Sequence, residues 1–459
     1  MRPILALLLA GSALAPSPAA AQSVDLDAVR EQIASMQAEI ARLTAQVEEL
    51  QAREQAQTVV PTPAAAAAQA PAPAPTPAPA AAAAPAIAWK GAPEISAPGG
   101  WSFKPRGRLQ IDTGVIDAPS DIAGNSLGTA TELRRAFLGF EGTLPGGFGY
   151  RMEADVANSS VELTDVFLTY KASQELILTV GQHKPFWGLD ELTSDLMTPF
   201  MERAAFNSAF GYERRVGLSG TYTSGDVIAQ LGAFTDNAAD LNADTNNSYS
   251  VDGRLVFAPK VGDGQLHLAA SAHVRDLNDA STTVRYRARP FLHTTDVRLV
   301  DTRAFSATGE RTFGAELAYM RGPFHVTFEG AQQTARRPGL EDPTFWGGYA
   351  EIGMLLTPGD KNAYRNGVYD RIRPSHPVNA GGIGAIQLNA RYDYLDLTDG
   401  GIVGGTQQSA GLSMLWIPTD YVRFLVNYGH LWIDDAAVLA GTDPDYQVDA
   451  FGMRAQFDF

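Results

Sequence analysis

Three arginines in the stretch RYRARP, at Arg285, Arg287 and Arg289, have the spacing and the chemistry of an anion path. Side chains alternate between the two faces of an extended chain, so these three would share one face at steps of roughly 7 Å. Such a row offers a moving anion successive sites that each replace part of its hydration shell. The planar guanidinium fork also suits bidentate recognition of phosphate oxygens. A solvated outer loop is the alternative interpretation of the same stretch.

Three further arginines, Arg135, Arg254 and Arg391, are the next candidates for contacts with an anion. Each lies on the polar side of a segment that alternates between apolar and polar residues. His267 and His273 share such a side, but an extended chain holds them too far apart for two ligands of one metal ion. We therefore expect no metal site and no cofactor.

The acids Asp190, Glu191 and Asp195 lie close together in a long segment that also contains His183. A carboxylate pair can perform acid–base chemistry, but no nucleophile accompanies these residues. Acids that face arginines across a water-filled neck produce a transverse electric field instead. The pattern favours a charged constriction over an active site, and we expect that the protein is not an enzyme.

The composition argues against several classes of protein. The 459-residue chain contains no cysteine, which rules out disulfides, thiolate metal sites and cysteine nucleophiles. Its formal net charge of −16 argues against a nucleic-acid-binding protein, whose binding domain is normally basic. After the N-terminus no stretch has about eighteen consecutive apolar residues, so membrane-spanning helices are not expected.

The N-terminal part of the chain falls into three segments. Residues 1–21 combine an early arginine, an apolar run and a small-residue end, which is typical of a secretory signal peptide. Residues 22–57 carry apolar residues at alternating spacings of three and four, which predicts a short coiled coil; one amphipathic helix packed on its own domain is the alternative. Residues 58–100 are rich in alanine and proline, which predicts a semi-rigid linker.

Residues 101–459 show repeated period-two alternation, which predicts roughly sixteen β-strands. The last of these, VDAFGMRAQFDF at Val448–Phe459, is apolar on one side and polar on the other and ends in phenylalanine. Such a strand suits a wall between lipid and water. We predict an all-β fold, a transmembrane antiparallel β-barrel preceded by the short N-terminal coiled-coil helix. A soluble barrel or sandwich would show the same alternation.

Connection lengths separate these two alternatives. Every second connection is short, as at Pro145-Gly146-Gly147, whereas the others include the long segments Lys184–Tyr212, Asp276–Glu310 and Asp434–Tyr446. This asymmetry is typical of an outer-membrane barrel with periplasmic turns and external loops. The first strand of the barrel then starts in the periplasm and the last strand ends there, so the coiled coil is also periplasmic. Pro358–Gly384 lies on the turn side yet is too long for a turn, so it either folds back into the exit or forms a solvated flap.

Four stretches resemble the phosphate-selective porin O/P family. They are LRRAFLGFEG at Leu133–Gly142, VELTDVFLTYK at Val161–Lys171, GQHKPFWGLDELTSDLMTPFMERA at Gly181–Ala204 and LNARYDYLDLTDG at Leu388–Gly400. The resemblance implies a trimeric, anion-permeable outer-membrane channel whose long loops fold into the lumen. It also implies an arginine ladder in an inward-folded loop, which the arginines of RYRARP match by type and spacing.

Two departures from the selective members of that family concern charge. Lysine occupies six scattered positions, where the selective members have clusters. The predicted lumen also carries acids among its arginines. These acids are Asp112, Glu141, Asp155, Asp252, Glu316, Glu329, Glu351 and Asp393. Both departures favour broader diffusion over tight phosphate selectivity.

We therefore predict an outer-membrane porin for passive uptake of small anions, with phosphate or polyphosphate as the expected solutes, through an arginine-lined constriction. A general diffusion porin with little phosphate selectivity and a structural tether are the alternatives. The expected partners are inorganic anions, outer-membrane lipid and lipopolysaccharide, the barrel assembly machinery and two further copies of this chain in a homotrimer. The heptad pattern fits a dimer as well.

Overall fold

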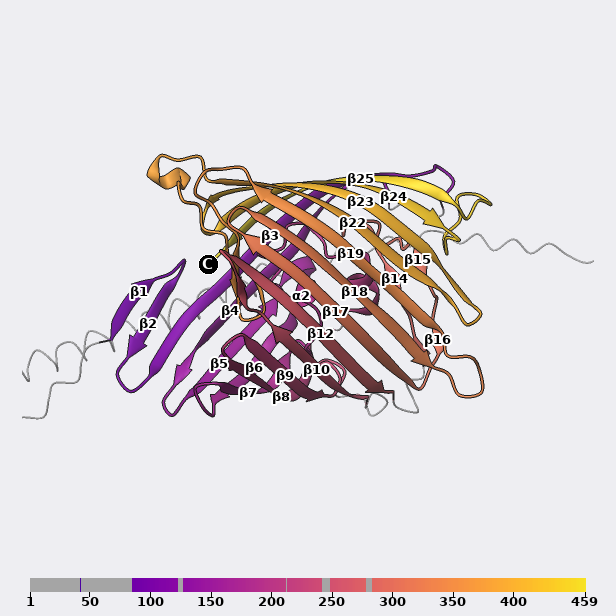
Figure 1. Cartoon of the computed structure of the whole chain (residues 1–459). Helices are drawn as coiled ribbons and strands as arrows, with labels where there is room; N and C mark the ends of the chain where they lie inside the picture. The colour runs from indigo at the N-terminus through magenta and orange to yellow at the C-terminus, as the bar shows by residue number, and fades with distance from the viewer. Residues whose placement is uncertain (1–41, 43–84, 123–126, 212, 242–247, 278–282) are drawn as a thin grey trace, which may run out of the picture. The chain divides into compact units, whose positions relative to one another are not determined.

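The computed structural model describes residue 42 and residues 85–122, 127–211, 213–241, 248–277 and 283–459 (Figure 1). The chain divides into two units, Met1–Ala80 and Ala81–Phe459. The signal peptide, the coiled coil apart from Arg42, and the linker up to residue 84 lie outside the described residues and stay predictions. None of the described helices is long and apolar enough to cross a membrane.

The second unit contains an antiparallel sheet of 19 strands. Sixteen of them close into a ring, because the last strand pairs with the first of the ring from Asp449–Asp117 to Asp458–Arg108. The ring consists of β3 (Trp101–Asp117), β4 (Thr129–Leu144), β5 (Phe148–Asp155), β6 (Glu162–Lys171), β7 (Leu176–His183), β8 (Arg215–Ser224), β9 (Val227–Phe234), β10 (Tyr249–Phe257), β12 (Gly264–Asp276), β17 (Gly309–Arg321), β18 (Phe324–Arg336), β19 (Thr344–Leu355), β22 (Ala385–Asp399), β23 (Ile402–Thr419), β24 (Val422–Asp434) and β25 (Tyr446–Asp458). The predicted all-β antiparallel barrel of about sixteen strands is confirmed.

Alternation along each strand separates an apolar outer surface from a polar lumen. In β25, Phe451, Met453 and Phe457 are exposed on the outside of the ring, whereas Arg454 and Gln456 are buried on the inside. Successive side chains of a strand point to opposite faces, so this order follows directly from the sequence. The closing strand has the two faces that its sequence predicts.

The two ends of the barrel differ in their connections. At the end that carries the C-terminus, which we call the turn end, most connections are short, and Lys260–Val261 forms the small strand β11. The opposite loop end carries the long connections and the helix η1 (Ala157–Ser159). One connection at the turn end is long, namely the one that joins β19 to β22. It contains β20 (Ala363–Arg365), β21 (Val368–Asp370) and η2 (Val378–Ala380).

A hairpin precedes the ring at the turn end, within the range predicted as linker. It consists of β1 (Ala86–Trp89) and β2 (Pro93–Ala97), and β2 pairs with the start of β3. Its turn packs on the β23–β24 turn, since a Cβ atom on Gly91 would lie 2.6 Å from the ring of Tyr421. Beside it the backbone N–H of Phe459 donates to the carbonyl of Gly107 at 3.0 Å. The hairpin thus continues the sheet beyond the seam where the barrel closes.

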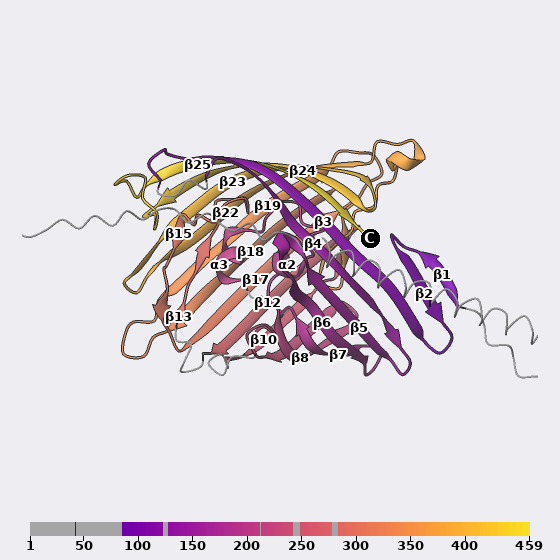
Figure 2. The same ribbon diagram turned by 180° about the vertical axis from the view of Figure 1, so that it is seen from behind.

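Two connections of the loop end fold into the lumen (Figure 2). The first inner loop, residues 184–211, contains α2 (Leu189–Leu192) and α3 (Ala205–Phe210). The second inner loop, residues 283–308, contains β13 (Thr283–Val284) and β14 (Arg287–Ala288), which pair with β16 (Phe305–Ser306) and β15 (Val300–Asp301). Both loops therefore narrow the lumen.

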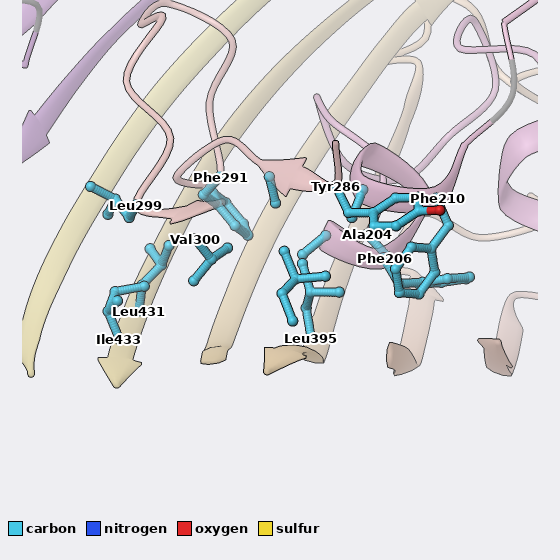
Figure 3. Packing of buried hydrophobic residues seen from close by; sticks show 14 of the residues in the cluster. Ala204, Phe206, Phe210, Tyr286, Phe291, Leu299, Val300, Leu395, Leu431 and Ile433 are labelled. Atoms are coloured by element: carbon cyan, nitrogen blue, oxygen red, sulfur yellow. The ribbon is translucent and has the colours of Figure 1, made fainter. Parts of the chain in front are cut away.

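Aromatic side chains hold the inner loops to each other and to the wall (Figure 3). The rings of Phe210 and Tyr286 meet edge to face with centroids 6.0 Å apart. Phe291 lies over two glycines that are directly paired across β23 and β24, Gly411 and Gly429. A Cβ atom at either glycine would come within 2.8 and 2.7 Å of the Phe291 ring, respectively. The two glycines form the seat of the second inner loop.

Candidate functional site

Acidic side chains tie the first inner loop to arginines of the barrel wall. Asp195 forms an ion pair with Arg108 and another, at 3.0 Å, with Arg135. Glu202 accepts hydrogen bonds from Arg134 at 3.0 and 3.1 Å. Burial favours the protonated acids, but the neighbouring arginines hold the pKa of both carboxyl groups well below their usual range. The loop is therefore fixed across the lumen by ionised pairs, and Asp195 faces arginines as its sequence predicts.

The other two acids of the predicted cluster bind within the loop itself. Asp190 accepts a hydrogen bond from the side-chain amide of Asn207 at 2.8 Å, and burial raises its pKa. Glu191 forms ion pairs with Lys184 at 2.5 Å and Arg203 at 3.2 Å. Burial, with the nearby Arg203, lowers the pKa of Lys184 to about 8. These acids stabilise the loop conformation.

A cavity of about 200 Å³, which we call the main cavity, lies where the two inner loops meet the barrel wall. Its lining combines five arginines with three acids and several neutral polar groups. It is lined by Arg134, Arg135, Glu191, Glu202, Arg203, Ala205, Asn207, Ser208, Arg289, Phe291, His293, Arg391, Asp393, Gln407 and Ser409. Three of the predicted anion contacts, Arg135, Arg289 and Arg391, thus lie around one cavity.

Arg289 and Arg391 reach the main cavity from two different elements, the second inner loop and the barrel wall. Arg289 comes from the second inner loop and pairs at 3.3 Å with Asp296, whose side chain is 96% exposed. Arg391 comes from β22, lies 4.3 Å over the ring of Phe200 and donates to the backbone carbonyl of Glu202 at 3.2 and 3.3 Å. Stacking and hydrogen bonds hold the Arg391 guanidinium in place, whereas Arg289 is held mainly through its own loop.

The three ladder candidates share one face of the second inner loop but do not line one cavity. The intervening residues are buried: Val284, Tyr286 and Ala288. Arg285 pairs with Asp301, with an Nε to Oδ1 distance of 2.8 Å, and lines a separate cavity of about 280 Å³. The side chain of Arg287 is exposed and makes no hydrogen bond or ion pair with the residues that the structure describes. Only Arg289 of the three reaches the main cavity.

Arg254 lies away from the main cavity, under the long turn-end connection. Its guanidinium pairs with Glu316 at 2.6 Å and donates to the carbonyl of Gly367 at 2.9 Å. His267 contacts the same carboxylate at 3.0 Å and the hydroxyl of Tyr364 at 2.7 Å. Strands β20 and β21 are thereby bound to the inside of the wall, so the connection folds back into the barrel.

A larger cavity of about 600 Å³, the turn-end chamber, lies between this connection and the wall. Basic side chains predominate in its lining. The basic residues are Lys90, Lys104, Arg106, Arg108, Arg151, Arg365, Arg371 and Arg373, and the acids are Glu153, Asp370 and Asp458. Asp195 joins the two cavities, because one of its partners, Arg108, lines the chamber and the other, Arg135, lines the main cavity.

Arg134 is a site residue that the sequence pattern missed. The pairing of β3 with β4 runs from Gln110–Arg135 to Ile111–Leu133, which leaves Arg134 as an extra residue. Such a bulge interrupts the strict alternation of a strand. Both adjacent arginines therefore line the main cavity, although a period of two assigns them to opposite faces. Arg203 and Glu202 were also missed, because their positions depend on how the first inner loop folds.

A closed ring of sixteen strands, with a polar lumen narrowed by inward loops, is the architecture of an outer-membrane porin. The family model "Phosphate-selective porin O and P" matches residues 103–459, and the chain belongs to this family. An uncharacterized protein of Caulobacter vibrioides is 44% identical over 479 residues, which cover 99% of this chain and 96% of that protein.

Solved structures of outer-membrane proteins share the fold, and two of them serve as examples. The anion-selective porin from Comamonas acidovorans is 12% identical with a TM-score of 0.50, over 78% of this chain and 100% of that one. The trimer form of OmpT, an outer-membrane protein of Vibrio cholerae, is 10% identical with a TM-score of 0.50 over the same shares. The predicted family is confirmed, and the chain is a bacterial outer-membrane porin and not an enzyme.

Proposed function

We propose that this porin forms a water-filled channel for the passive diffusion of small anions, with phosphate or polyphosphate as preferred solutes. One observation carries the proposal, namely the excess of positive charge where the inner loops narrow the lumen. The arginines are Arg134, Arg135, Arg203, Arg289 and Arg391, and the acids are Glu191, Glu202 and Asp393. An anion passing this cavity meets more attraction than repulsion.

Arg289 is the arginine best placed to exchange its partner for a solute. Its ion pair with Asp296 involves an almost fully exposed carboxylate, and such pairs are weak because water screens them. Arg134 and Arg135, by contrast, are held by Glu202 and Asp195, whose side chains are only 18% and 12% exposed. The wall arginines set the field of the cavity, while Arg289 can bind the anion and release it.

The remaining candidates have supporting roles in this proposal. Arg285 and Arg287 lie on the same inner loop as Arg289 and attract anions towards the main cavity. The turn-end chamber continues the basic surface beyond it. Arg254 positions the folded-back connection through Gly367 and does not contact the solute.

General diffusion with little phosphate selectivity is the second candidate. It is favoured by the acids that accompany almost every lumen arginine, including Glu202 with Arg134 and Glu316 with Arg254. Guanidinium groups that already have partners attract anions broadly and offer fewer free donors for one particular oxyanion. The two candidate functions predict the same selectivity for anions over cations, but only the first predicts that phosphate blocks the chloride current.

The proposed assembly is a homotrimer, with the turn end and the coiled coil in the periplasm and lipid and lipopolysaccharide around the apolar outer surface. The polar and apolar faces of β25 support recognition by the barrel assembly machinery. Cross-linking of the membrane-inserted protein should give a trimer band. A dimer as the largest species would contradict this assembly.

Conductance in planar lipid bilayers tests the function. Purified full-length protein under a potassium chloride gradient should give a reversal potential on the anion side. Addition of phosphate should then reduce the chloride current at concentrations well below that of chloride. A cation-selective reversal potential would exclude the anion channel, and anion selectivity without phosphate block would favour general diffusion.

A further inference from the structure

Three polar atoms on two neighbouring strands of the main cavity lack hydrogen-bond partners among the described residues. They are Nε of Arg391, Oδ1 of Asp393 and Oε1 of Gln407. These three residues are only 6%, 3% and 2% exposed, respectively. A buried polar atom without a partner costs free energy, so such atoms mark where water or a solute completes the hydrogen bonding.

The register of β22 and β23 places these groups side by side. Asp393 is paired with Ser409, and the next inward position on β23 is Gln407. Arg391 and Asp393 are two residues apart on β22 and point into the lumen together. The Nε atom of Arg391 lies 3.8 Å from Oδ2 of Asp393, and Oδ2 accepts a hydrogen bond from the backbone N–H of Ala205 at 2.9 Å. Oδ1 of Asp393 remains for a group in the cavity.

We infer that the main cavity selects anions that also carry a hydrogen-bond donor, with Asp393 as the specificity-determining residue. This inference rests on the proposed anion channel and names the chemistry of its solute. The arginines bind the negative oxygens, and Oδ1 of Asp393 accepts a hydrogen bond from a hydroxyl of the same solute. Gln407 is the second acceptor, although its amide can rotate to present nitrogen instead.

A donor-free anion is disfavoured at this position for two reasons. It displaces the water that would satisfy Asp393 without replacing the hydrogen bond, and it has no O–H group to place between its own charge and the carboxylate. Inorganic phosphate at neutral pH keeps at least one P–OH group, whereas sulfate keeps none. A hydroxycarboxylate likewise has the hydroxyl that a simple carboxylate lacks. The shared chemistry is an oxyanion with an attached OH, and the cavity of about 200 Å³ accommodates either kind.

Block of the chloride current by matched anion pairs tests the inference on the full-length channel. Phosphate is compared with sulfate, and lactate with propionate, at one pH and ionic strength. One hydrogen bond to a charged group corresponds to about a tenfold difference, so the donor-bearing member of a pair should block at about one tenth of the concentration. A preference only for phosphate identifies an inorganic solute, and a preference only for lactate identifies an organic one.

The substitution Asp393→Asn should bring the concentration ratio of a preferred pair to within about twofold of unity, because an amide donates to sulfate as readily as it accepts from phosphate. Asp263→Asn is the matched control. It removes the same charge from an 88% exposed side chain at the β10–β12 turn and should leave the ratio unchanged. Should Asp393→Asn fail to insert, Gln407→Leu is the second variant, with a loss of about threefold expected.

Failure of the inference can be told apart from failure of the proposed function. An anion-selective reversal potential with equal block within both pairs overturns the inference and leaves the anion channel intact. A wild-type preference that survives in Asp393→Asn assigns the discrimination to other residues and also overturns the role of Asp393. A cation-selective reversal potential overturns the proposed function itself.

Discussion

The main cavity and the turn-end chamber use the same basic residue types in different surroundings. The main cavity measures about 200 Å³, and most of its arginines are bound to partly buried acids or to backbone carbonyls. The chamber measures about 600 Å³, and the side chains of Arg365 and Arg373 are 70% and 66% exposed there. Fixed guanidinium groups can distinguish the geometry of a solute, whereas exposed ones mainly raise the local concentration of anions.

The same difference determines how salt acts on the two regions. Exposed charges are screened beyond a Debye length of about 8 Å at physiological ionic strength, and buried pairs are screened much less. Salt should therefore weaken the contribution of the chamber and preserve that of the main cavity. The experiments below test the difference between the main cavity and the chamber.

The largest effect is expected from Phe291→Ala, which removes the ring seated on Gly411 and Gly429. Loss of a buried phenylalanine ring costs about 3–5 kcal/mol, and here the cost falls on the docking of the second inner loop. Single-channel recordings should show larger and noisier currents with reduced anion selectivity. Phe313→Ala, on the outer surface, is the control. Quiet, fully selective channels in Phe291→Ala would show that this ring does not hold the loop.

The next largest effect is expected from Arg289→Ala in the main cavity. Removal of one unit charge about 4 Å from a passing anion costs about 1 kcal/mol in water, which is about fivefold in anion-over-cation permeability. Reversal potentials under a salt gradient measure this ratio. Arg285→Ala should change the ratio less, because Arg285 lines another cavity. Equal effects of the two substitutions would indicate that Arg285 and Arg289 are equivalent sites of one arginine ladder.

A smaller effect is expected from the double substitution Arg365→Ala and Arg373→Ala in the chamber. Conductance should fall about twofold at low salt and return to the wild-type value near 1 M salt, where the Debye length is about 3 Å. The reversal potential should stay close to that of the wild type. A change in selectivity that persists at high salt would show that the chamber takes part in discrimination.

The smallest effect is expected from titration of Lys184. Because burial lowers its pKa to about 8, this ammonium is charged at pH 7 and largely neutral at pH 9. Loss of its charge leaves Glu191, which lines the main cavity, paired with Arg203 alone. Anion selectivity should therefore decline slightly from pH 7 to pH 9. Lys184→Met should show the lower selectivity at both pH values, and a persistent decline in that variant would implicate another group.

Much of the barrel could be predicted because it depends on local alternation. The parity of Val448–Phe459 gave the two faces of β25, and the connection lengths gave the two ends. The bulge at Arg134 could not be predicted in this way, because one extra residue reverses the parity of the strand without a composition signal. The hairpin β1–β2 likewise lies within a range whose alanines and prolines predict a linker.

The candidate site was harder to predict because its parts come from distant segments. The shared face of Arg285, Arg287 and Arg289 follows from the extended backbone and could be read directly. Which of them reaches the main cavity depends on how Phe291 seats the loop, and that contact joins residues far apart in the chain. Wall positions such as Arg135 and Arg391 were predictable as lumen residues, but their convergence with the inner loops was not.

Because Gly411 and Gly429 form the seat of Phe291, substitutions at these two glycines can change the width of the channel although they do not line it. Neither glycine lines the main cavity, yet the ring that covers both of them does. A single methyl group added at either position has no space under Phe291 and must push the ring, with its loop, towards the solute. Substitution of either glycine by alanine should therefore narrow the aperture without altering any charge along the path.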